Sequence, residues 1–298
     1  SSLAPLAFGR DQDANPATGR ATRSLAFLSR EALELDLSDP EQRHFGDYEL
    51  LECLGAGGTG VVYRARQKSL DREVAIKLLS AGPWASPDFI ERFQREAQSA
   101  ARLQHPNIVA IYEIGSCDEL NYFSMALVHG PNLAQLLAER GAMPARQVAK
   151  LVQTIAEALH YAHRLGVLHL DLKPGNVLTT ENGEPQIADF GLARRIDDSL
   201  MPDGDEISGT PSYMAPEQIE MHRHQLGVAT DIYGLGTILY ELLSGQPPFN
   251  ADTPKQTLDL VLHGRLRHLD RYRNDIPPDL EAICRKCLCK EPRHRYPN

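Results

Sequence analysis

The periodicity of the apolar residues changes near Pro131, and this change limits the folds that the chain can adopt. Before Pro131, short segments alternate apolar and polar residues with the period of two that is typical of β-strands. After it, apolar residues recur at helical spacing, above all in residues 144–165, a segment closed by Gly166. Strands followed by helices predict an α+β protein with a sheet lobe and a larger helical lobe.

The sheet lobe is expected to contain five antiparallel strands and one main helix. The expected strands lie near residues 48–54, 61–66 and 74–78, then at 105–109 and 121–125 around a turn at 115–119. The helix is expected to begin at Ser86-Pro87-Asp88, which combines a cap, a proline and an early acid.

A glycine-rich turn, Gly55-Ala56-Gly57-Gly58-Thr59-Gly60, joins the first two strands. The same glycine spacing occurs in dinucleotide-binding turns, but a helix follows those turns. Here Val61-Val62-Tyr63 is β-branched and alternating, which favours a second strand. Glycines in such a hairpin let backbone N–H groups approach a phosphate closely. The turn is therefore interpreted as a phosphate-binding hairpin.

Lys77 and Glu96 are charged residues at positions that are unexplained separately, and an ion pair between them would explain both. Lys77 shares a strand face with the small residue Ala75, although a lysine on a strand is most often simply solvated. Glu96 lies in the apolar stripe of the expected helix, where an acid is costly unless it is paired. An ion pair between them accounts for both residues.

Residues 169–176 place three chemically active side chains in one loop after the long helix. Asp171 can accept a proton from a hydroxyl, Lys173 can neutralise a phosphate, and Asn176 can offer an oxygen to a metal ion. Asp189, in Asp189-Phe190-Gly191, supplies a second oxygen ligand suited to Mg²⁺. These are the requirements of phosphoryl transfer, in which catalysis is mostly positioning and charge stabilisation.

Composition excludes several other classes of protein. A net charge of −9 argues against nucleic acid or an anionic membrane as the main partner. There is no basic-then-apolar leader and no run of roughly 18 apolar residues, so we expect a cytoplasmic chain. A membrane tether of the full-length protein would then lie beyond Asn298.

The five cysteines, an odd number, predict reduced thiols rather than a disulfide framework. Cys284, Cys287 and Cys289 raise the alternative of a metal site. A helix that begins at Pro278 would place the first two on its buried face and the third elsewhere. We therefore favour a structural role in the core.

The motifs, in this order, resemble the Hanks-type serine/threonine protein kinases, over about residues 47 to 298. They are the glycine turn, the strand lysine, the helix glutamate, H-x-D-x-x-x-x-N at 169–176, D-F-G at 189–191, A-P-E at 215–217 and the closing Arg295. The glycine turn, Arg95-Glu96-Ala97 and Val177 are most similar to the bacterial branch of that family.

The resemblance implies a bilobal fold and a role for each matching residue. Catalytic roles fall on Asp171, Lys173, Lys77, Glu96 and Thr210, with Thr210 bridging Asp171 and Lys173. The metal ligands would be Asn176 and Asp189. The nucleotide would bind Leu54, Gly55, Ala56, Gly57, Gly58, Thr59, Gly60, Val62, Ala75, Lys77, Met125, Ala126, Leu127, Val128 and Leu178. Ala100, Ile111, His169 and Phe190 would stack as a spine, and Arg295 would pair with Glu217.

The expected activity is transfer of the ATP γ-phosphoryl group to Ser or Thr of protein substrates. ATP and Mg²⁺, with Mn²⁺ as an alternative metal, are the implied cofactors, and self-association for autophosphorylation is expected. A catalytically silent scaffold and a small-molecule phosphotransferase are the other two readings. The D-F-G and A-P-E motifs argue against the phosphotransferase.

The expected organisation is an N-terminal extension at 1–44, a sheet lobe at 45–127 and a helical lobe at 128–298 that stops before its last helix. The extension is either mobile or docked on the sheet lobe in a regulatory role. One position departs from the family pattern: Leu170 stands where most protein kinases have arginine. We predict that activity will not depend on phosphate in residues 194–208, because leucine cannot bind one.

Overall fold

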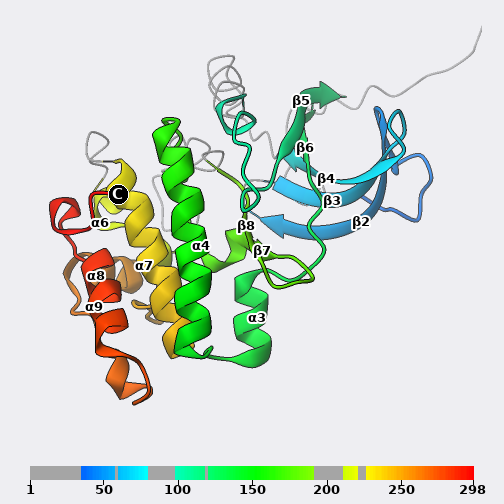
Figure 1. The fold of residues 1–298 in the computed structure, drawn as a ribbon. Helices are drawn as coiled ribbons and strands as arrows, with labels where there is room; N and C mark the ends of the chain where they lie inside the picture. Colours follow the sequence, from blue (N-terminus) through cyan, green and yellow to red (C-terminus); the bar gives the residue numbers. More distant parts are fainter. Residues whose placement is uncertain (1–34, 58–59, 80–97, 118–119, 191–210, 221–225) are drawn as a thin grey trace, which may run out of the picture.

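The sheet and most of the helices occupy separate parts of the molecule (Figure 1). This structure, a computed structural model, describes residues 35–57, 60–79, 98–117, 120–190, 211–220 and 226–298. The strands there are β1 (His44–Phe45), β2 (Tyr48–Gly57), β3 (Gly60–Gln67), β4 (Arg72–Leu79), β5 (Ile111–Cys117), β6 (Leu120–Met125), β7 (Val177–Thr179) and β8 (Pro185–Ile187). The helices are α3 (Leu133–Arg140), α4 (Ala145–Arg164), α6 (Pro216–Ile219), α7 (Val228–Ser244), α8 (Pro254–His263) and α9 (Pro278–Cys287). Short 3₁₀ helices are η1 (Pro174–Asn176), η2 (Pro211–Tyr213), η4 (Leu269–Arg271) and η5 (Pro292–His294).

The N-terminal lobe is an antiparallel sheet with the strand order β1-β2-β3-β4-β6-β5. The described sheet therefore has six strands, and the predicted count of five was one too few. The additional strand is β1, whose Phe45 pairs with Tyr48 across a tight turn. Gly46 makes that turn with φ +55°, a left-handed conformation that costs glycine little.

The prediction of a strand at residues 105–109 was wrong, because β5 begins at Ile111 and continues through Gly115. Residues 107–109 instead join the two lobes. The Val109 N–H donates to the Ile187 carbonyl at 2.9 Å, and the Ile187 N–H donates to the Asn107 carbonyl at 2.9 Å. These backbone groups are satisfied by the end of β8 and not by the sheet.

The alternation of β4 gives the sheet two different faces. Val74, Ile76 and Leu78 lie in a fully buried cluster against which Leu35 and Leu37 also pack. Ala75 and Leu79 lie in a second cluster on the side of the helical lobe. The face that carries Ala75 and Lys77 is therefore the one that can meet a ligand between the lobes.

The C-terminal lobe is built around α7, which is buried along most of its length. It packs against α4 and α9, and the three helices lie beside one another in Figure 1. At Gly234 a side chain would collide with Leu172, so glycine lets the loop after α4 approach the helix backbone closely. α7 thus forms the rigid floor under residues 169–176.

The helices predicted at residues 144–165 and from Pro278 are confirmed, whereas the start of the helix predicted at Ser86 lies outside the described residues. Asn132 caps α3, Pro144 precedes α4, and α9 begins at Pro278. Cys284 and Cys287 are buried in the core, and Cys289 is partly exposed. No cluster of potential metal ligands occurs among the residues that the structure describes.

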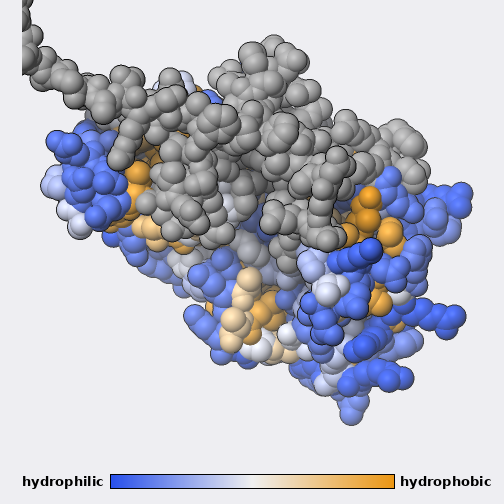
Figure 2. Space-filling view, turned by 180° about the vertical axis from the view of Figure 1, so that it is seen from behind, coloured by the Kyte–Doolittle hydropathy of each residue, from blue (hydrophilic) through white to orange (hydrophobic). Residues whose placement is uncertain are grey.

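No helix within the described ranges combines the length and the apolar character needed to cross a bilayer. Seen from the side opposite to Figure 1, the coloured part of the surface is largely hydrophilic, and hydrophobic residues appear there in separate small groups (Figure 2).

Candidate active site

In the loop after α4, two of the predicted side chains donate hydrogen bonds to the carboxylate of the third, Asp171. Asp171 Oδ2 accepts a hydrogen bond from Lys173 Nζ at 2.8 Å and from Asn176 Nδ2 at 3.0 Å. Asn176 Nδ2 also donates to the backbone carbonyl of Asp171 at 2.8 Å. With Nδ2 held in this way, the other amide atom of Asn176, its oxygen, is the one that can face a cation.

The β7–β8 hairpin brings Asp189 to this loop. Ala188 directly follows β8, and its N–H donates to the Asn176 carbonyl at 2.9 Å. A ring nitrogen of His169 lies 2.9 Å from the Ala188 carbonyl. The next residue, Asp189, adopts φ +61°, one of three positive φ values among the described non-glycine residues. A second one belongs to Leu170. Backbone strain is therefore concentrated at this site.

Lys77 reaches across from the sheet lobe to Asp189, with Nζ 2.7 Å from Oδ2. Burial acts to raise the pKa of the Asp189 carboxyl, but the charge and hydrogen bond of Lys77, together with His169 and Lys173, outweigh burial. The pKa is therefore lowered and the carboxylate stays charged. The other oxygen, Oδ1, is buried and has no hydrogen-bond partner among the described residues. A buried carboxylate oxygen without a partner, on the residue after Ala188, whose N–H bonds the Asn176 carbonyl, fits a divalent cation.

The apolar residues predicted to contact a base lie together in one cluster. Its buried members include Ala75 and Met125, and its partly buried members include Val62, Ala126, Leu127, Val128 and Leu178. These residues come from both lobes and from the segment that joins them. They provide the flat apolar surface that a heteroaromatic ring requires. Leu54 is 46% exposed and lies outside the cluster.

The glycine turn forms the tip of the β2–β3 hairpin, as predicted, with Gly57 paired to Gly60. Gly60 has φ +145°, and a Cβ there would collide with the Leu78 carbonyl, so only glycine fits. A Cβ at Gly55 or Gly57 would meet no described residue within 4 Å, which leaves room for a ligand beside these two glycines. Gly58 and Thr59 lie outside the described residues.

Two other predicted site residues, Glu96 and Thr210, also lie outside the described ranges, so the expected Lys77–Glu96 pair remains a prediction. The predicted spine residues come together in part. The rings of His169 and Phe190 are in contact in a tilted arrangement, with centroids 4.8 Å apart and an interplanar angle of 54°. Ala100, Ile111 and Phe190 line one small cavity, which Met125 also lines.

Asp231 is a site residue that the sequence reasoning missed. Its carboxylate accepts the backbone N–H of His169 at 2.8 Å and that of Leu170 at 2.7 Å. A nitrogen of His163 lies 2.7 Å from the same carboxylate. The available signal was the acid itself, because an aspartate in a nearly all-apolar helix needs buried hydrogen-bond partners.

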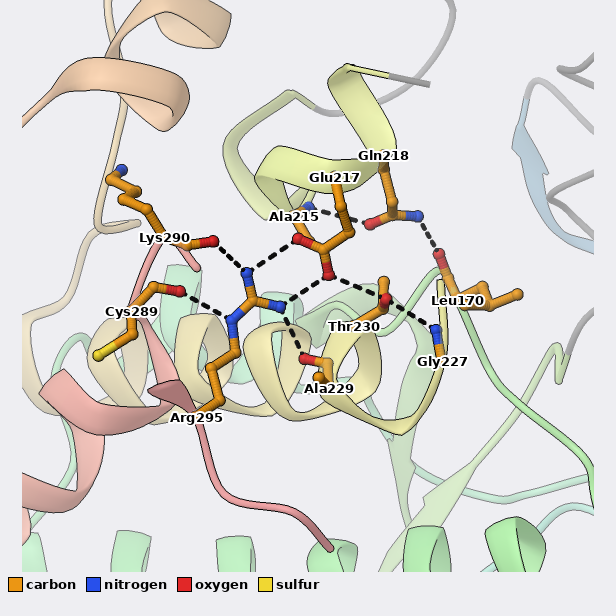
Figure 3. Close-up of polar contacts among 10 residues, drawn as sticks. All are labelled: Leu170, Ala215, Glu217, Gln218, Gly227, Ala229, Thr230, Cys289, Lys290 and Arg295. Carbon is orange, nitrogen blue, oxygen red and sulfur yellow. Dashed lines mark hydrogen bonds and ion pairs between the residues drawn. The ribbon is translucent and has the colours of Figure 1, made fainter. Parts of the chain in front are cut away.

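The predicted pairing of Arg295 with Glu217 is confirmed, and it is buried (Figure 3). Arg295 Nη1 and Nη2 lie 2.7 and 2.9 Å from the two Glu217 oxygens. The remaining N–H groups donate to the carbonyls of Ala229, Cys289 and Lys290 at 2.7 to 2.8 Å. All five guanidinium hydrogens are therefore used. The pair fixes α6, which begins within the A-P-E motif, onto the helical lobe.

The sequence matches the protein kinase domain over residues 48–297. The chain belongs to the protein kinase family. Serine/threonine-protein kinase PrkC of Bacillus subtilis is 35% identical to it over 258 residues, which cover 86% of this chain and 39% of that protein. Serine/threonine-protein kinase PknB of Mycobacterium tuberculosis is 36% identical over 269 residues, which cover 85% of this chain and 41% of that protein.

The fold of the kinase domain is also found in a solved structure. The crystal structure of the Mycobacterium tuberculosis PknI kinase domain matches with a TM-score of 0.67 and 29% identity, covering 86% of this chain and 93% of that chain. These similarities make the chain a serine/threonine protein kinase domain of the Hanks type, in a family that uses ATP and a divalent metal ion on protein substrates. The chain spans about two fifths of the length of the curated relatives it matches.

Proposed function

We propose that this domain transfers the γ-phosphoryl group of ATP to Ser or Thr hydroxyls of protein substrates in a reaction that depends on Mg²⁺. The observation that carries the proposal is the arrangement at Asp171. One of its oxygens is held by Lys173 and Asn176, which leaves the other to accept the proton of an incoming hydroxyl. Lys173 then lies beside the transferring group and offsets its charge.

Asn176 and Asp189 would hold the metal ion, since their oxygens fit a hard cation. When bound, Mg²⁺ would neutralise charge on the phosphate oxygens and fix their orientation. Lys77, only 4% exposed and within reach of Asp189, would contact the phosphates nearest the nucleoside. The apolar cluster around Ala75 and Leu178 would enclose the adenine, with the backbone of residues 126–128 along its edge.

The remaining organisation is proposed on the same grounds. The boundaries stand at residues 1–44, 45–127 and 128–298, and autophosphorylation would require a second copy of the domain. Mn²⁺ would replace Mg²⁺ at the same two ligands, because both ions bind oxygen donors. A silent scaffold is not favoured, because Lys173 and Asn176 are hydrogen-bonded to Asp171, and Asp189 is paired with Lys77.

The proposal is tested by incubating the wild-type chain with Mg²⁺–ATP and a generic protein acceptor that contains Ser, Thr and Tyr. We expect phosphate on Ser and Thr alone, and EDTA should abolish the transfer. Nucleotide binding without transfer would instead identify a scaffold. Transfer to a small-molecule alcohol and not to protein would identify the other phosphotransferase class.

Leu170 makes this kinase a variant without arginine before the catalytic aspartate, and we propose that its activity does not require a phosphorylated activation segment. Leucine has no donor for a phosphate, whereas a guanidinium would bind one by charge-assisted hydrogen bonds. Ser199 and Ser208, the two serines of residues 194–208, lie outside the described residues.

Replacing both Ser199 and Ser208 with alanine is expected to leave kcat on a peptide substrate within about twofold of the wild type, since Leu170 offers no charge for a phosphate to bind. The measurement compares each protein before and after phosphatase treatment. A large loss of turnover in the double variant, or on dephosphorylation of the wild type, would contradict the proposal.

A further inference from the structure

Gln218 joins two segments that are 48 positions apart in the chain. Its Oε1 accepts the backbone N–H of Ala215 at 2.9 Å, at the start of α6. Its Nε2 donates to the backbone carbonyl of Leu170 at 2.8 Å (Figure 3). The carboxamide thus bonds the first residue of the A-P-E motif with one atom and the catalytic loop with the other.

The carbonyl that Gln218 holds belongs to a strained residue. Leu170 has φ +65°, a left-handed conformation that a non-glycine residue keeps only where its surroundings enforce it. The Leu170 N–H is fixed by Asp231 Oδ1 at 2.7 Å. The peptide before Leu170 is therefore held by α7, and the peptide between Leu170 and Asp171 is held by Gln218.

The segment that carries Gln218 is rigid. Its neighbour Glu217 makes the buried bidentate pair with Arg295 and also accepts the Thr230 hydroxyl at 2.9 Å. Ala215 and Pro216 are buried as well. The position of the Gln218 side chain is thus defined by the core of the helical lobe and not by solvent.

We propose that Gln218 is a positioning residue for Asp171. By donating to the Leu170 carbonyl, it holds the Leu170–Asp171 peptide in its strained orientation. It also couples the catalytic loop to residues 211–218 through a neutral hydrogen bond that requires no phosphate. The inference rests on the proposed function in one respect: the positioned group is taken to be the base in phosphoryl transfer.

The role depends on the donor atom, which allows a sharp test. Gln218→Glu keeps an oxygen for the Ala215 N–H and the same side-chain shape, but it removes the N–H that bonds Leu170. Gln135 offers a matched control, because its Oε1 accepts the N–H of Asn132 at 2.8 Å at the start of α3, and its side chain is exposed. Gln135→Glu makes the same change of charge at the same helix position, away from the catalytic loop.

For Gln218→Glu we expect kcat on a peptide to fall about tenfold or more relative to Gln135→Glu, because small misplacements of a catalytic group reduce rates steeply. The KM for ATP should change by less than about twofold, since the nucleotide contacts are untouched. Amide hydrogen exchange of residues 169–172 should become faster than in the control, while the Tm of the two variants stays similar. Where the added charge lowers the Tm, Gln218→Met removes both hydrogen bonds without a charge and should show the same two changes.

The inference is overturned if kcat and exchange in the Gln218→Glu and Gln218→Met variants match those of Gln135→Glu. It is also overturned if the loss appears only in the KM for ATP. A wild type that transfers no phosphate would refute the proposed function alone. The exchange measurement needs no turnover, so faster exchange at residues 169–172 would still support the positioning role.

Discussion

Replacing Asp171 with asparagine is expected to lower kcat for peptide phosphorylation by about 10²–10⁴-fold, the usual contribution of a general base. An asparagine oxygen can still accept the hydrogen bonds that Lys173 and Asn176 now donate. The loop should therefore keep its shape while it loses the basic oxygen and the negative charge. The measurement is steady-state transfer to a peptide, together with the Kd for Mg²⁺–ATP, which should change little.

Glu181→Gln is the control for this experiment. Glu181 is an exposed carboxylate in the turn between β7 and β8. Its replacement by glutamine makes the same change, carboxylate to carboxamide, as Asp171→Asn, but it leaves the catalytic loop intact. Its kcat should match that of the wild type. Near-normal turnover in the Asp171→Asn variant would exclude Asp171 as the base, and a parallel loss of nucleotide binding would point to misfolding of the loop.

Replacing Arg295 with methionine is expected to lower the free energy of unfolding by about 3–5 kcal/mol, because Glu217 would be left as a buried charge without its partner. The two side chains are 0% and 1% exposed, so water cannot take the place of the guanidinium. Five hydrogen bonds would be lost at once, three of them to backbone carbonyls. The measurement is the urea unfolding curve of each protein, monitored by circular dichroism.

Arg293 provides the comparison, since it lies two residues away, is 78% exposed and is 3.9 Å from Glu291. Arg293→Met should change the free energy of unfolding by less than about 1 kcal/mol, as exposed pairs contribute little. A double variant, Glu217→Met with Arg295→Met, should be more stable than Arg295→Met alone, because it leaves no unpaired charge. Equal losses from Arg293→Met and Arg295→Met would show that the buried pair contributes nothing special.

Much of the fold was predictable because local signals and the core agree. Asn132 and Pro278 mark helix starts, and the alternation of residues 74–78 separates the two faces of β4. The predictions that failed lacked such a local signal. Residues 105–109 contain apolar side chains suited to a strand, but their backbone partners lie in β8, which sequence periodicity cannot show.

The candidate site divides in the same way. Asp171, Lys173, Asn176 and Asp189 were found from the chemistry of their side chains and their spacing. Asp231 and Gln218 were missed, because they act through backbone groups of other segments. A side chain that bonds a distant carbonyl leaves no pattern of its own in the sequence. The left-handed backbone of Leu170 is equally invisible, since leucine rarely adopts it.

The sequence by itself determined which groups can perform the chemistry, because the donor and acceptor atoms of a side chain belong to its residue type. It also determined the order of the lobes, because strand and helix periodicities are local properties. Only the tertiary structure decided how these groups are held. Asp189 meets Lys77, α7 fixes Leu170, and Gln218 couples the catalytic loop to α6. These contacts depend on the packing of segments that are far apart in the chain, and no local preference specifies that packing.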